Sequence, residues 1–210
     1  MKQILLISLL ATSIQLAVLA DEVGASTPGE IMVSKLYSLN NKLIYKDAAV
    51  QQAAVNDFIT TTGSNLIPDL IESLRYAHNT GYLYIAERVF RAIQPSPAEA
   101  ILNALATESD PAQRAKLIVC LRGLDSPAVR ATLRSRLDDT GYRADPPRGG
   151  LEGPFPTVRR VCDEAYNTMV YNMGQPNAMI PLHGSNTGTA AFNQAIATLK
   201  QQLDAVDASH

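Results

Sequence analysis

Cys120 and Cys162 are the only cysteines of the 210-residue chain, and their thiols are the first groups to consider for chemistry. Cys162 lies in VRRVCDEAYNTM, residues 158–169, between an arginine pair and an acidic pair. A catalytic thiol needs a partner base, and no histidine lies near Cys162 in the sequence. Two cysteines in an exported protein allow a disulfide, whereas a buried cysteine acts as a small apolar side chain. A Cys120–Cys162 disulfide and two core positions are therefore the roles to weigh.

The histidines and adjacent carboxylates give little basis for an enzyme. No two of the three histidines, His78, His183 and His210, have the spacing of metal ligands. His183 lies in the polar loop PLHGSNTG and is a candidate for ligand contact, because loops often carry function. Asp163 and Glu164 would point about 100° apart on a helix, so they do not converge as an acid/base pair. We expect a non-catalytic protein without a cofactor or metal; the alternative is a small all-α hydrolase or lyase with His183 as acid/base.

Arginine is concentrated in residues 110–160, which contain ten basic and six acidic residues. Arg130 and Arg134 are one helical turn apart and share a face. This face either pairs with aspartates of the same chain or docks an acidic protein or an anionic glycan. The whole chain has a net charge of −2, which argues against a nucleic-acid binder. The candidate binding residues are Arg130, Arg134, Arg159, Arg160, Tyr142, Phe155 and His183.

The N-terminus has the pattern of a secretory signal peptide. It reads MKQILLISLLATSIQLAVLADE, with one lysine before an apolar run and small or branched residues up to Ala20. We expect cleavage after Ala20, export to the periplasm or the medium, and no membrane span in the mature chain. The mature chain, residues 21–210, is long enough for one domain with its own core.

Helix signals recur along the rest of the chain. Thr27-Pro28-Gly29-Glu30, Ser96-Pro97-Ala98-Glu99 and Asp110-Pro111-Ala112-Gln113 each combine a capping residue, a proline and an acid or amide three residues after the cap. Apolar residues follow at spacings of three and four, and no stretch alternates long enough for a convincing strand. The sequence predicts an all-α chain with helices at 30–45, 47–60, 66–75, 82–93, 97–108, 111–124, 127–138, 156–173 and 188–206.

The predicted helices form pairs whose apolar positions superpose. A shift of 31 residues carries Ala86, Val89, Phe90 and Ile93 onto Leu117, Cys120, Leu121 and Leu124. A further shift of 45 carries these onto Cys162, Ala165, Tyr166 and Met169. Both cysteines therefore lie on stripes that face neighbouring helices, one turn out of register. This favours core positions, although a disulfide stays open.

The motifs IPDLIESL, SPAEAILNAL, SPAVRATLRSRL and VRRVCDEAYNTM make residues 65–173 resemble the HEAT-repeat family, in its short bacterial form. The resemblance implies a HEAT-like α-solenoid, of three to four antiparallel helix pairs, whose curved face binds proteins. Residues 21–64 are expected to form N-terminal capping helices. Residues 174–210 are expected to supply a loop and a C-terminal helix whose apolar stripe either caps the stack or mediates self-association.

Two proline- and glycine-rich segments, 141–156 and 174–187, interrupt this pattern. A long segment without regular structure is often functional or disordered, and 141–156 carries Tyr142 and Phe155. Together these features predict an exported, non-catalytic scaffold that binds another protein or an anionic ligand. A self-associating structural protein of the cell envelope is a further alternative.

Overall fold

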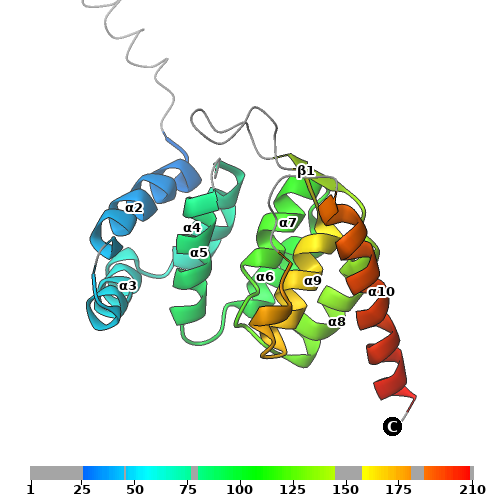
Figure 1. Cartoon of the computed structure of the whole chain (residues 1–210). Helices are drawn as coiled ribbons and strands as arrows, with labels where there is room; N and C mark the ends of the chain where they lie inside the picture. Colours follow the sequence, from blue (N-terminus) through cyan, green and yellow to red (C-terminus); the bar gives the residue numbers. More distant parts are fainter. Residues whose placement is uncertain (1–25, 45, 77–79, 145–157, 181–186, 209–210) are drawn as a thin grey trace, which may run out of the picture.

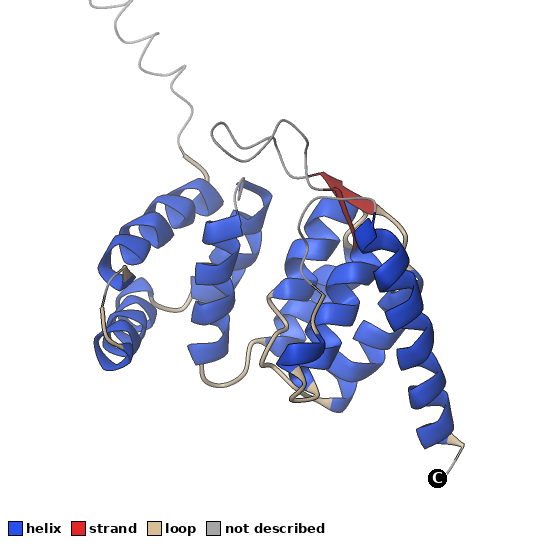
Figure 2. Cartoon of the chain, viewed as in Figure 1, coloured by secondary structure: helices blue, strands red, loops and turns tan. Residues whose placement is uncertain are grey.

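The structure, a computed structural model, describes residues 26–44, 46–76, 80–144, 158–180 and 187–208. Helices make up most of these residues, so the predicted all-helical class is confirmed (Figures 1 and 2). The α-helices are α2 (Pro28–Leu43), α3 (Ala48–Thr62), α4 (Leu66–Ser73), α5 (Thr80–Ala92), α6 (Ala98–Thr107), α7 (Pro111–Val119), α8 (Pro127–Ser135), α9 (Val161–Asn172) and α10 (Thr187–Asp207). Three short 3-10 helices are η1 (Leu74–Tyr76), η2 (Arg136–Asp138) and η3 (Pro176–Ala178).

Side-chain caps fix the start of several helices. Thr27 and Glu30 form the predicted capping box: Glu30 N–H donates to Thr27 Oγ1 at 3.2 Å and Thr27 N–H donates to Glu30 Oε2 at 2.8 Å. Asp110 and Ser126 cap α7 and α8 with a single bond each, from the N–H of Ala112 at 2.9 Å and of Val129 at 3.2 Å, without a reciprocal bond. Ser96 Oγ accepts from the N–H of Ala98 at 3.4 Å, but Pro97 is the cap residue of α6, so the predicted capping box with Glu99 is not formed.

Helices contact their neighbours in a regular order. Each helix from α2 to α7 packs against the helix two places later in the chain, so α2 contacts α4, α4 contacts α6 and α6 contacts α8. The second series runs through α3, α5, α7 and α9. Figure 1 shows α2 and α3 at one end of the molecule and α10 at the other. One continuous apolar core joins these helices, with fully buried residues in successive members such as Leu36, Leu70, Ile101 and Leu133.

The bounds of two helices, α7 and α9, differ from the predicted ones by five residues at one end, and the other helices differ by up to three. Residues 158–160 belong to strand β2 (Val158–Arg160), which pairs antiparallel with β1 (Tyr142–Ala144), so α9 begins at Val161 instead of residue 156. α7 ends at Val119, and a tight turn over Cys120–Gly123 replaces the predicted last turn of helix. Gly123 has φ +75°, a left-handed conformation that stops an α-helix.

The predicted signal peptide and most of the 141–156 segment lie outside the described residues. Among the helices that the structure does describe, none is long and apolar enough to cross a membrane.

The turn at Gly123 gives a stability prediction. A Cβ at this position would lie 2.5 Å from Arg91 Cδ, and Tyr171 Oη accepts a 2.7 Å hydrogen bond that helps hold Arg91 in place. Gly174 has a similar φ of +74° but open space around it. We expect Gly174→Ala to lower the free energy of unfolding by about 1–2 kcal/mol, the cost of left-handed backbone. Gly123→Ala should lose about 1–3 kcal/mol more through the steric clash.

Urea denaturation of both variants measures this difference. An equal decrease in the free energy of unfolding for Gly123→Ala and Gly174→Ala would show that the Arg91 side chain moves away from the new Cβ at no measurable cost.

Candidate functional site

The most deeply buried charges surround Arg122, in the turn that follows α7. Arg122 Nη2 donates to Glu164 Oε2 of α9 at 3.2 Å, and its Nη1 lies 3.9 Å from Glu87 Oε2 of α5. Its Nε donates to Thr168 Oγ1 at 3.4 Å. All four of these side chains are buried, and Glu164 is fully excluded from solvent. The Arg122 cluster (Glu87, Arg122, Glu164 and Thr168) therefore ties α5 and α9 to the end of α7.

Burial disfavours the charged form of one of these carboxylates, Glu87. Desolvation raises the pKa of Glu87 above its usual value, and the charges of Arg122 and Arg91 only partly oppose this effect. The folded chain thus holds the Glu87 proton more tightly than the unfolded chain does. The stabilisation from a protonated Glu87 is complete below the unfolded pKa and is lost as the pH rises through the folded pKa. Arg122 is the group that limits this loss at neutral pH.

α9 is buried along nearly its whole length, and its polar side chains bond within the chain. Asp163 accepts a hydrogen bond from Arg160 Nη2 at 2.7 Å. Asn167 makes two bonds to the backbone of Ile180, as donor at 3.0 Å and as acceptor at 2.9 Å. Tyr166 Oη donates to the carbonyl of Ala178 at 3.2 Å. These bonds fasten the segment after α9 over the helix and keep its carboxylates from solvent.

The arginines predicted to bind a partner are engaged inside the chain. Arg130 pairs with Asp125 at 3.4 Å, and Arg134 pairs with Asp204 and Asp207 of α10. Arg160 is buried and bonds to Asp163 and to Asn193 Oδ1. Arg–Asp pairing within the chain, one of the two interpretations above, accounts for all three.

Of the other predicted binding residues, only the side chain of Tyr142 lies within the described part of the chain. Tyr142 lies on β1 and is 63 % exposed. The side chain of Arg159, and all of Phe155 and His183, lie outside the described residues.

Cys120 and Cys162 are buried, and no disulfide joins them. Cys162 Sγ lies 3.7 Å from Asp163 Oδ1. Burial, together with the Asp163 charge, raises the pKa of Cys162 to about 11, so the group is a protonated thiol at physiological pH. Both cysteines act as small core residues.

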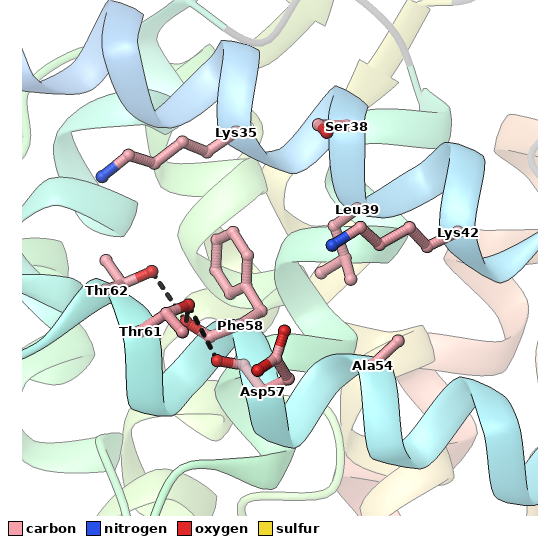
Figure 3. Close-up of a pocket in the computed structure, with 9 residues that line it drawn as sticks. All are labelled: Lys35, Ser38, Leu39, Lys42, Ala54, Asp57, Phe58, Thr61 and Thr62. Atoms are coloured by element: carbon pink, nitrogen blue, oxygen red, sulfur yellow. Dashed lines mark hydrogen bonds between the residues drawn. The ribbon is translucent and has the colours of Figure 1, made fainter.

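An open hollow lies between α2 and α3, and we call it the α2–α3 groove (Figure 3). Its volume is about 230 Å³. Leu39 and Phe58 form an apolar floor, with Lys35, Ser38 and Lys42 along the α2 wall. The α3 wall consists of Ala54, Asp57, Thr61 and Thr62. The sequence did not predict this groove, although Lys35 and Lys42 lie seven residues apart and so on one face of a helix.

Both lysines of the groove are available to a ligand. Among the described residues, no carboxylate lies within ion-pair distance of Lys35 or Lys42. The Thr61 and Thr62 hydroxyls instead donate to backbone carbonyls of Asp57 and Phe58, at 2.8 and 2.7 Å. The groove thus carries two positive charges on α2 against one negative charge, Asp57, on α3, beside an apolar floor. This excess of positive charge along α2 suits recognition of an acidic partner.

A second, more polar hollow lies between α4, α6 and α7. The Arg75–Glu108 ion pair, 2.7 Å long, crosses it, so its charges are already neutralised. Over the described part of the chain, no group of three or more His, Cys, Asp or Glu side chains is placed to hold a metal ion. Comparisons of the chain with protein families, with curated proteins and with solved structures give no match.

Removal of the Arg122 charge should be costly. We expect Arg122→Met to lower the free energy of unfolding at pH 7 by about 3–5 kcal/mol, because Glu87 and Glu164 would stay buried without their counter-charge. Arg88→Met is the matched control: Arg88 is half-buried and donates to the neutral Gln51 Oε1, a bond worth about 1 kcal/mol.

Urea denaturation of the two variants provides the measurement. The triple variant E87Q/R122M/E164Q should recover part of the loss. A loss in Arg122→Met no larger than that in Arg88→Met would refute the charge argument.

The cysteines give a chemical prediction. Native protein at pH 8 should not react with Ellman's reagent on the minute timescale, because both thiols are buried and the Cys162 pKa is about 11. Unfolding in guanidinium without reductant should release two reactive thiols per chain. Fewer than two would instead reveal a disulfide in the purified protein.

Proposed function

We propose that the chain is an exported, non-catalytic scaffold of HEAT-like helix pairs that binds another protein. Contact between each helix and the one two places later is the observation that carries this proposal. Such an order is expected of stacked helix pairs, in which first helices line one side and second helices the other. The signal-peptide pattern at residues 1–20 supports export.

Use of the buried charges supports a binding role over a catalytic one. Glu87 and Glu164 are paired with Arg122 between helices, and Asp163 is paired with Arg160 at the start of its own helix, so all three carboxylates stabilise the fold and are buried. The lysines of the α2–α3 groove, in contrast, face solvent with no acidic partner among the described residues. A partner with acidic side chains fits this groove better than it fits the arginines of α8, which already pair with aspartates.

Self-association through α10 is less favoured by the packing. Phe192, Ile196 and Leu199 of its apolar stripe are buried within the same chain, and Phe192 packs edge-on against Tyr166 of α9. A dimer through this stripe would first have to detach α10 from α9.

Cross-linking of the purified chain in extract of its source cells, with linked peptides mapped by mass spectrometry, tests the proposal. We expect one reproducible partner protein, linked to the folded chain and not to a heat-unfolded control at the same concentration. Links only between copies of this chain would favour self-association. No links at all to another protein would contradict the scaffold role and direct attention back to His183.

A further inference from the structure

The two walls of the α2–α3 groove carry side chains at identical spacings. On α2, Ile31, Lys35, Ser38 and Lys42 are exposed and follow one another at intervals of four, three and four residues. On α3, Val50, Ala54, Asp57 and Thr61 repeat the same intervals. Such intervals keep side chains on one face of a helix over three turns. Each wall is therefore a straight stripe that runs the length of the groove.

The two stripes run in opposite directions. Gln51 near the start of α3 donates from Nε2 to the carbonyl of Leu43 at the end of α2, at 2.9 Å. Figure 3 accordingly shows Lys35 across from Thr62 and Lys42 nearer Ala54. Ile31 thus extends the α2 wall at one end of the groove, and Val50 extends the α3 wall at the other.

Apolar surface is exposed at both ends and in the middle. Ile31 and Val50 are each 46 % exposed, although most large apolar residues of the chain are buried. Phe58 is half-buried in the floor between them. Exposed apolar groups at regular positions along one groove are typical of a site that an amphipathic helix covers.

The two walls of the groove differ in charge. The α2 wall carries Lys35 and Lys42, whereas Asp57 is the single charged residue of α3. The Cα atoms of the two lysines are about 10.5 Å apart along the helix axis, which is close to two helical turns. Acidic side chains seven residues apart on a bound helix would match both lysines.

We propose that the α2–α3 groove binds one amphipathic helix of a partner protein, with acidic residues at positions i and i+7 beside α2. Apolar residues at i+3 and i+4 lie over Phe58. The inference rests on the proposed scaffold function and names the chemistry of its partner. A helix of about 12 residues, roughly 18 Å long, spans the stripes from end to end.

A direct test uses a fluorescein-labelled 18-residue Ala/Gln peptide designed as a helix. It carries two glutamates seven residues apart, and leucines three and four residues after the first glutamate. Fluorescence anisotropy measures its Kd for the full purified chain. Lys35→Glu and Lys42→Glu should each weaken binding about two- to fivefold, the range for exposed ion pairs. The double variant should weaken it about tenfold or more. Lys35→Glu should leave the melting temperature close to that of the unaltered chain, since Lys35 has no acidic partner among the described residues. Lys42→Glu should lower it slightly, because Lys42 lies in the last turn of α2, where a positive charge is favourable.

Lys46→Glu is the matched control, because Lys46 is exposed and lies outside the groove lining. It should bind the peptide like the unaltered chain. A peptide with lysines in place of both glutamates should bind only the K35E/K42E variant. An equal effect of Lys46→Glu, or no preference for glutamate over lysine in the peptide, would overturn the inference.

The same measurements separate this inference from the scaffold function. If cross-linking identifies a partner protein but its links avoid α2 and α3, the groove inference fails and the scaffold stands. If the peptide binds as expected but no partner is found in cell extract, the groove chemistry holds and the scaffold function fails.

Discussion

The packing of α5, α7 and α9 depends on one guanidinium group. Arg122 sits in the turn after α7 and meets a carboxylate from each flanking helix, Glu87 on one side and Glu164 on the other. A planar guanidinium with five N–H donors can serve both acids at once, which a lysine in the same place could not do with equal geometry. The Arg122 charge lets α9 bury Glu164 completely, and Arg160 at the start of the helix does the same for Asp163.

Electrostatic pairing divides the molecule into two unlike parts. From α7 onward, arginines meet carboxylates of other segments, as in the pairs of Arg134 with Asp204 and Asp207, and Arg114 with Asp139 at 2.8 Å. These pairs join elements that lie far apart in the sequence. The α2–α3 pair shows the opposite arrangement, with a charge-poor second helix and two lysines left for solvent. The arginines from α7 onward thus hold the fold together, whereas the two lysines of α2 can pair with a partner molecule.

Local patterns predicted the helices but not what joins them. Apolar spacing and the caps at Thr27, Asp110 and Ser126 placed most helices within a few residues, since these signals act over one or two turns. Strand β2 was missed because its pairing with β1 is a contact between distant segments. The same limit hid the α10 partners of Arg134 and the groove. Lys35 and Lys42 mark a site only once α3 is known to lie beside them.

α3 is the least supported helix of the stack, and this bears on why the groove faces solvent. Val55 is its single fully buried residue among the described positions. α3 packs against α2 and α5, and no further helix of the described residues covers its outer face. An end layer of stacked helices exposes apolar surface that inner layers bury against their neighbours. A partner helix in the groove would bury Ile31, Val50 and Phe58 together. These side chains contribute little hydrophobic stabilisation while they are exposed in the isolated chain, so their burial would favour the complex.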